Sequence, residues 1–218
     1  MDFKRSDPSP AATAATTSTS TLPNRASGNG HARSAPIPVK IVVAGGFGVG
    51  KTTFVASISE ITPLTTEAAL TEVTAEVDRT REGTTKSTTT VALDFGRITL
   101  GDDLVLYLFG APGQQRFQFM WSDLCRGAIG AVVLVDTRRL EDCFQAVDYF
   151  EQLGLPFLVA VNCFFGSSGH TEENVREALA ISQHVPVLMC DARQRDSTKT
   201  MLIELVQYAL ELASSPPG

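Results

Sequence analysis

Several features typical of membrane, secreted and metal-binding proteins are missing from this sequence. No run of apolar residues approaches the roughly 18 that a membrane-spanning helix needs, and the first residues do not form the apolar core of a signal peptide. The four cysteines are scattered without a C-x-x-C pair, and the three histidines are not grouped with them. This spacing argues against a zinc site and predicts buried free thiols in a reducing cytosol.

Aromatic residues are nearly absent from the first 36 positions, which are rich in Ser, Thr, Ala, Pro and Gly. Such a composition buries too little apolar surface to offset the entropy of ordering, so we predict a disordered tail over residues 1–36. We expect one domain over residues 37–214 and a flexible end at 215–218. The tail contributes +2 to the net charge of −6, which leaves about −8 for the rest and argues against a nucleic-acid partner.

A phosphate-binding motif, G-x-x-x-x-G-K-[ST], is complete from Gly45 to Thr52, directly after an apolar run. Its glycines let successive backbone N–H groups point into one concavity, and the helix that follows adds its positive dipole end. Lys51 would reach the β- and γ-phosphates, and the Thr52 hydroxyl would ligate Mg²⁺. The motif predicts a site for a nucleoside di- or triphosphate without choosing the base. The expected phosphate contacts are Gly45, Phe47, Gly48, Val49, Gly50, Lys51, Thr52 and Thr53.

Short apolar runs alternate with helical stretches from residue 38 onward. Strands are predicted at 39–44, 90–100, 104–109, 128–135, 155–161 and 185–189, and helices at 51–59, 138–153, 171–181 and 197–213. Thr171 is expected to cap the third helix. The two strands around the turn at 101–103 should pair antiparallel. This order predicts a three-layer α/β P-loop NTPase domain, whose six-stranded sheet is mostly parallel with one antiparallel edge strand. Residues 60–89, rich in Thr and Glu, are predicted to form a long mobile loop.

The order of the later motifs resembles that of Ras-like small GTPases. The run GAPGQQ at 110–115 follows the hairpin, and Asn162 and the run CDAR at 190–193 stand where that family has its two base-reading motifs. Within the superfamily, the run from Thr90 to Gly96 is most similar to the bacterial MglA-type GTPases and to the small G proteins of actinobacterial conservon operons. The resemblance covers roughly residues 40–213.

The resemblance implies a guanine-nucleotide-binding switch that uses GTP or GDP with Mg²⁺. Thr90 resembles the switch I threonine that ligates Mg²⁺ and binds the γ-phosphate, and Gly113 resembles the switch II glycine. Gln114 resembles the residue that orients the attacking water. Asn162, Ala192 and Arg193 would contact the base.

The family also implies binding partners and a location. These are a roadblock-type regulatory protein and a sensor-kinase-like membrane complex. The expected location is cytoplasmic, with peripheral association at the inner face of the membrane through those partners.

Departures from the family pattern affect the metal site and hydrolysis. Gly110 stands where the family usually has a carboxylate for Mg²⁺. Asp94 on the paired strand is either its replacement or a strand-surface carboxylate. Phe47 replaces a glycine that faces the γ-phosphate. Its ring would slow hydrolysis unless it turns away, and Pro112 should restrict the switch segment.

Other departures affect the base site and the surfaces. Phe165 replaces the aspartate that reads guanine, and Cys163 replaces the lysine that covers the base, so base selectivity should be reduced. Arg79, Arg81 and Arg116 are either catalytic arginines or exposed charges. The apolar residues of segment 117–121 form either a partner surface or part of the core. The alternative to a switch is a hydrolysis-deficient nucleotide-binding scaffold. A small-molecule kinase is disfavoured, because no arginine-rich lid is visible.

Overall fold

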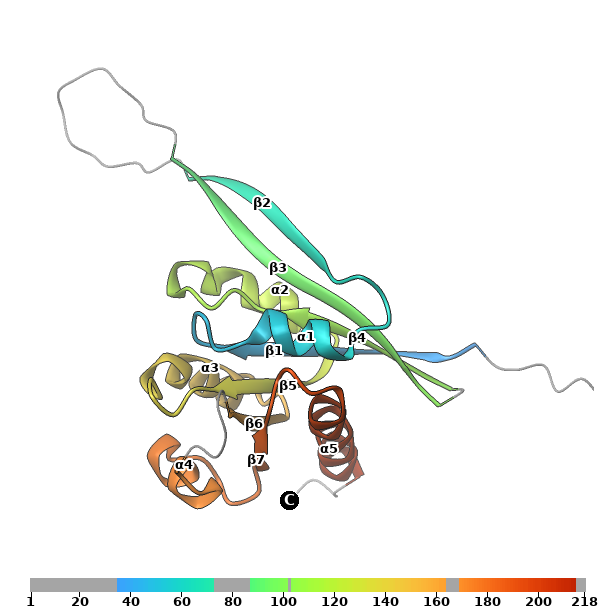
Figure 1. Ribbon diagram of the computed structural model, residues 1–218, viewed down its shortest axis with the longest axis vertical. Helices are drawn as coiled ribbons and strands as arrows, with labels where there is room; N and C mark the ends of the chain where they lie inside the picture. The colour runs from blue at the N-terminus through green and yellow to red at the C-terminus, as the bar shows by residue number, and fades with distance from the viewer. Residues whose placement is uncertain (1–34, 73–86, 102, 164–168, 215–218) are drawn as a thin grey trace, which may run out of the picture. The chain divides into compact units, whose positions relative to one another are not determined.

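A seven-stranded sheet in the order β2-β3-β4-β1-β5-β6-β7 organises the protein (Figure 1). The computed structural model describes residues 35–72, 87–101, 103–163 and 169–214. The strands are β1 (Ile37–Gly45), β2 (Leu64–Glu72), β3 (Ser87–Leu100), β4 (Leu104–Gly110), β5 (Ala128–Val135), β6 (Phe157–Asn162) and β7 (Val187–Cys190). The helical segments are α1 (Lys51–Ile58), η1 (Gln115–Met120), α2 (Trp121–Cys125), α3 (Glu141–Leu153), α4 (Glu172–Leu179) and α5 (Arg195–Ser214).

The strand directions confirm the predicted fold class. β1 pairs in parallel with β4 and β5, and the parallel pairing continues through β6 to β7. β3 is antiparallel to both β4 and β2, so it is the one strand of the described sheet that runs in the opposite direction. Parallel strands are buried on both faces, so their sequences are near-continuous apolar runs, and these runs predicted the strands.

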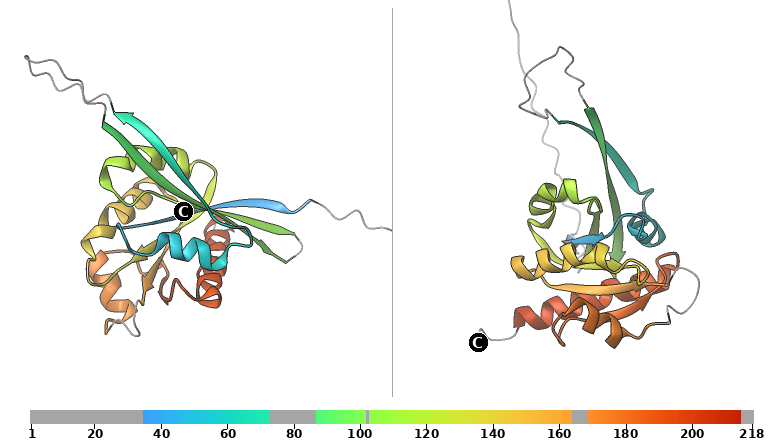
Figure 2. Two further views of the ribbon diagram at one scale, coloured as in Figure 1. Left: turned by 45° about the horizontal axis from the view of Figure 1, so that its top comes forward. Right: turned by 90° about the vertical axis from the view of Figure 1, so that its left-hand side faces the viewer.

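The segment predicted as a loop over residues 60–89 contains a strand. β2 pairs with β3 through nine register positions, from Leu64 opposite Phe95 to Glu72 opposite Ser87. The sheet therefore has seven strands in place of the predicted six, and β3 is not at its edge. The sequence of β2 is rich in Thr and Ala and carries no apolar run, so its strand character comes from pairing with β3. Figure 2 shows the two strands side by side.

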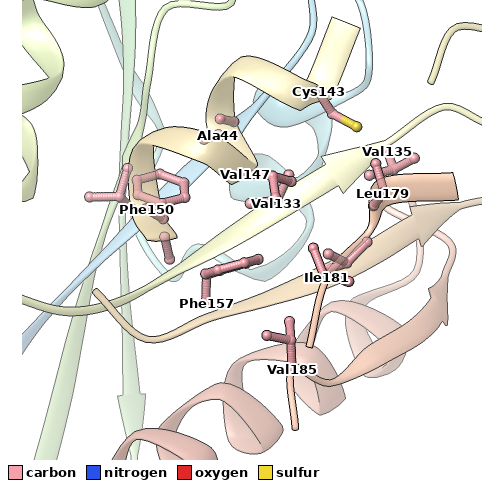
Figure 3. Close-up of a cluster of buried hydrophobic side chains, with 14 of the residues drawn as sticks. Ala44, Val133, Val135, Cys143, Val147, Phe150, Phe157, Leu179, Ile181 and Val185 are labelled. Carbon is pink, nitrogen blue, oxygen red and sulfur yellow. The ribbon is translucent and has the colours of Figure 1, made fainter. Parts of the chain in front are cut away.

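Two layers of helices cover the sheet, because alternate residues of each strand face opposite sides. On β1, Val42 and Ala44 face the cluster that also contains residues of α2, α3 and α4 (Figure 3). Ile41 and Val43 face a second cluster, formed with α1 and α5. All four β1 side chains are almost completely buried. The phosphate-binding motif therefore begins at the end of a strand fixed from both sides.

Segment boundaries differ little from the predicted ones, and two short helical segments are additional. Thr171 caps α4 as predicted, since its Oγ1 accepts a hydrogen bond from the N–H of Asn174 at 3.2 Å. η1 and α2 were not predicted, because each, with 6 and 5 residues, is too short by itself to show helical periodicity. The predicted tail and C-terminal end lie outside the described residues, except for residues 35 and 36. None of the described helices has the length and apolar character required to cross a membrane.

Three of the four cysteines are buried free thiols, as predicted. They are Cys125, Cys143 and Cys190, whereas Cys163 is partly buried. Burial raises the pKa of the Cys143 thiol to about 12, so this side chain stays protonated and packs as a small apolar group at neutral pH.

Phe150 and Phe144 of α3 provide a matched test of the core. Phe150 is 1% exposed and stacks on Trp121 with ring centroids 6.1 Å apart, whereas Phe144 is 43% exposed. We expect Phe150→Ala to lower the free energy of unfolding by about 3–5 kcal/mol, because it leaves a cavity. Phe144→Ala should change it by less than about 0.5 kcal/mol. Urea unfolding measures both, and equal effects would contradict the described packing.

Candidate nucleotide-binding site

The turn between β1 and α1 depends on glycine. Gly45, Gly48 and Gly50 have φ angles of 136°, 73° and 104°, a region that other residues rarely adopt. The turn borders a cavity of about 380 Å³. The cavity is lined by Phe47, Gly48, Gly50, Lys51, Thr52, Thr53, Asp94, Ala111, Pro112, Gly113, Gln114 and Phe117. Most of the residues predicted to contact phosphate and metal therefore meet at one place.

Lys51 projects back over the turn. Its Nζ donates to the carbonyl oxygens of Gly45 at 2.9 Å and Gly46 at 2.7 Å. Burial lowers the pKa of the ammonium group to about 8, and nearby Asp94 acts in the opposite direction. The cavity therefore holds a poorly solvated cation, and an anionic ligand would stabilise its charged form.

Asp94 lies beside Thr52, in the position that Gly110 leaves open. Its Oδ2 accepts a hydrogen bond of 2.7 Å from the Thr52 hydroxyl, and the residue is only 7% exposed. Asp94 and Gly110 are register partners on β3 and β4. A Cβ atom at Gly110 would lie 2.9 Å from the Asp94 Cβ and 3.1 Å from its Oδ2. The absence of a side chain at 110 thus makes room for the carboxylate from the adjacent strand.

The segment after β4 packs against the phosphate-binding turn, and Gly113 makes the contact. A Cβ atom there would lie 2.5 Å from Lys51 Nζ and 2.9 Å from the carbonyl carbon and oxygen of Gly46, so only glycine fits. Gln114 follows at the cavity wall, and its Oε1 accepts a 3.0 Å hydrogen bond from Arg116 Nε. The Gln114 amide, which was predicted to orient water, is therefore hydrogen-bonded to Arg116 in this conformation.

The predicted base-contacting residues lie at the ends of β6 and β7. The Nδ2 of Asn162 donates to the Val49 carbonyl at 2.8 Å, so this side chain braces the turn. Its Oδ1 accepts the N–H of Ala192 at 3.1 Å. Ala192 was predicted to contact the base, and here its N–H is already hydrogen-bonded within the protein. Arg193 forms a bidentate pair with Asp191 at 2.9 and 2.8 Å.

Phe47 lies at the rim of the cavity, with 65% of its surface exposed. Its backbone carbonyl oxygen forms a hydrogen bond, whereas its ring is mostly exposed. Arg139 Nη2 donates to that oxygen at 2.7 Å. Arg139 and its neighbour Asp142, at the start of α3, did not figure in the sequence interpretation, because no local motif links them to a turn some 90 residues away.

The remaining predictions have different outcomes. Thr90 lies on β3 opposite Ala69, but its side chain is outside the described part, as are Arg79, Arg81 and Phe165. In segment 117–121, Phe117 and Trp121 are buried and Met120 is partly buried. Trp121 Nε1 donates to the Pro112 carbonyl at 3.3 Å. Packing therefore accounts for most of this apolar group, and only Phe119 is largely exposed.

Fold and site together define a P-loop nucleotide-binding protein with the G-domain fold. Residues 43–212 match the family described as "Conserved hypothetical ATP binding protein", and the chain belongs to that family. An uncharacterized protein of Methanocaldococcus jannaschii, MJ1339, is 28% identical over 126 residues, covering 57% of this chain and 69% of that one. The Ras-related protein SEC4 of Candida albicans is 26% identical over 133 residues, covering 56% of this chain and 63% of its own.

Solved structures with the same fold come from the FeoB iron transporter of T. maritima. Its cytosolic domain in a GDP form matches with a TM-score of 0.57 at 14% identity, covering 80% of this chain and 64% of that chain. Its G domain matches with a TM-score of 0.51 at 16% identity, covering 82% of this chain and all of that chain. These likenesses concern the fold.

Asn162 offers a test of the brace between the turn and the base region. Asn162→Ala removes two buried hydrogen bonds and leaves the Val49 carbonyl and the Ala192 N–H unpaired. We expect the free energy of unfolding to fall by about 2–4 kcal/mol. Asn174→Ala removes an exposed capping residue of α4 and should cost about 1 kcal/mol or less. Chemical unfolding compares the two, and a loss at Asn162 no larger than at Asn174 would contradict the brace.

Proposed function

We propose that this protein is a guanine-nucleotide-binding molecular switch with slow, Mg²⁺-dependent GTP hydrolysis. The observation that carries the proposal is the convergence of Lys51, Thr52, Asp94 and Gly113 on one cavity. These residues come from the turn before α1, from β3 and from the segment after β4. The Lys51 ammonium and the glycine N–H groups of the turn can bind phosphate oxygens. The Thr52 hydroxyl and the adjacent Asp94 carboxylate can bind Mg²⁺.

The residues present fit a magnesium ion bound with the nucleotide phosphates. Thr52 Oγ1 and Asp94 Oδ2, which are 2.7 Å apart, are the oxygen ligands that this ion prefers. Thr90, four residues before Asp94 on β3, is the further candidate ligand. When bound, Mg²⁺ would neutralise phosphate charge. We therefore assign to Asp94 the role that the family usually gives to a carboxylate at position 110.

Switching would involve the segment around Gly113. Its backbone lies against Lys51 and Gly46, so the γ-phosphate end of a ligand would contact this segment directly. Such contacts can order neighbouring loops in one nucleotide state and release them in the other. Gln114 is the candidate for orienting water. Phe47 borders the cavity, and its ring would lower the hydrolysis rate by turning inward toward the γ-phosphate.

Guanine is the base that we propose, with weaker selectivity than in family members with an intact base site. Similarity to a Ras-related protein and to a cytosolic domain solved in a GDP form supports guanine, whereas the family description names ATP. The Ala192 N–H already bonds Asn162, and Phe165 cannot read the guanine edge. The MglA-type or conservon-type attribution is part of the proposal, as are the roadblock-type partner and the sensor-kinase-like complex.

Nucleotide identity is the direct test. The nucleotide that co-purifies with the full chain should be GDP or GTP, and GTP should displace a labelled GDP analogue better than ATP does. The two competition curves with Mg²⁺ measure the selectivity. Equal displacement by ATP would contradict the guanine assignment, and no displacement by either would contradict nucleotide binding.

Asp94→Asn tests the relocated metal carboxylate. The amide keeps the size of the side chain but removes the charge that would hold Mg²⁺. The gain in GDP affinity that Mg²⁺ gives the unmodified protein should fall roughly tenfold or more, as expected for a lost charge-assisted contact. Titrations with Mg²⁺ and with a chelator measure this gain. Asp123→Asn, which changes an exposed carboxylate of α2, is the control and should leave it unchanged. An unaltered Mg²⁺ effect in Asp94→Asn would contradict the assignment.

A hydrolysis-deficient scaffold is the second candidate. The contact between Gln114 and Arg116 favours it, because the amide oxygen is engaged away from any substrate water. Single-turnover phosphate release from GTP separates the two functions. A switch would release phosphate slowly, and Gln114→Ala would slow it further. No release above the rate in buffer, in the unmodified protein, would support the scaffold.

A further inference from the structure

The phosphate-binding turn has a second, supporting side. One side of the turn borders the cavity through Phe47, Gly48, Gly50 and Lys51. The other side meets the end of β5 and the start of α3, where Gly46 and Val49 lie with Asp136, Arg139 and Asp142. Nothing in the proposed function uses this second group of charged side chains.

Arg139, two residues before the first residue of α3, contacts the turn through one backbone atom. Its Nη2 donates to the Phe47 carbonyl at 2.7 Å, and its Nη1 lies 3.6 Å from Asp142 Oδ2. Asp142 in turn packs against Gly46, where an added Cβ would lie 2.5 Å from the Asp142 Cβ. Arg139 is thus held by a carboxylate that itself contacts the turn, and both lie outside the cavity.

The direction of the Phe47 carbonyl sets the direction of the next N–H group. A trans peptide unit is planar, so the N–H of Gly48 points opposite to the Phe47 carbonyl oxygen. With the oxygen directed to Arg139, that N–H points away from the α3 side of the turn. Gly48 borders the cavity on the opposite side and has a positive φ of 73°.

A glycine-rich turn can also adopt the reversed peptide. Gly48 has no side chain to resist rotation, and reversal would direct a carbonyl oxygen toward a bound phosphate. A guanidinium bond to the carbonyl opposes that reversal, because it is charge-assisted and would be lost. We propose that Arg139 is a positioning residue, which holds the Phe47–Gly48 peptide with its N–H directed toward the phosphates. This inference rests on the proposed nucleotide-binding function.

The expected effect is moderate and specific for phosphate. The side chains of Arg139 and Asp142 are 48% and 38% exposed, so solvent weakens their interaction. We expect Arg139→Met, which keeps the aliphatic stem but cannot donate, to weaken binding of GDP and of inorganic pyrophosphate by about tenfold. Binding of guanosine, which has no phosphate, should be unchanged. Arg139→Lys should restore part of the affinity, since lysine can also donate to a carbonyl.

The experiment measures the affinities of GDP, pyrophosphate and guanosine, by calorimetry or by competition, on the full chain with Mg²⁺. Arg126→Met is the matched control, because this exposed arginine pairs only with Asp123 among the described residues. It should bind all three ligands like the unmodified protein. A thermal melt of each variant reports folding. Should Arg139→Met not fold, Asp142→Asn is the second variant, with a smaller loss expected in GDP and pyrophosphate affinity.

The outcomes separate this inference from the proposed function. If the unmodified protein binds GDP and pyrophosphate and Arg139→Met binds them equally well, the positioning role is wrong and the proposed function stands. Equal losses for guanosine and pyrophosphate would also overturn the role, because they indicate general damage to the site. If the unmodified protein binds neither GDP nor pyrophosphate, both the proposed function and this inference fail.

Discussion

A buried amide, that of Asn162, connects the three segments on which the nucleotide site depends. From the end of β6 it donates to the turn at Val49 and accepts from the backbone after β7 at Ala192. An added Cβ at Gly50 would lie 2.8 Å from its Nδ2, so the turn must be glycine at this contact. Hydrogen bonds sheltered from water are strong, and their loss leaves unpaired groups behind. The amide therefore links the phosphate-binding turn to the ends of β6 and β7, at one side of the sheet.

The proposed magnesium site depends on the packing of two adjacent strands. β4 ends in glycine, and the register of β3 against β4 brings Asp94 into the space that this glycine leaves. The carboxylate then meets Thr52, which belongs to α1. Adjacent strands can present a carboxylate to the same point of a site from different positions of the chain. Strand register decides which residue does so.

The turn itself is supported from the helix side as well as from the strands. Arg139, just before α3, contacts Phe47, and Asp142 of α3 contacts Gly46, while Lys51 and Gly113 lie on the cavity side. A glycine-rich turn has little conformational preference of its own. Contacts on both of its sides are what restrict it to one backbone path. The adjacent Phe47 ring is not part of this restraint, since it lies mostly in solvent.

Local sequence patterns were sufficient to predict the central strands, the four predicted helices and the phosphate-binding turn. Buried apolar runs and a glycine motif are properties of neighbouring residues, so they can be recognised without the fold. β5 spans the predicted residues without change, and the other predicted segments shift by at most about three residues. β2 was missed because its Thr-rich sequence becomes a strand only through pairing with β3. The pairing of Thr52 with Asp94 and of Phe47 with Arg139 likewise required the fold. These partners are 42 and 92 residues apart, and their meeting is set by sheet register and helix packing, which no short stretch of sequence encodes.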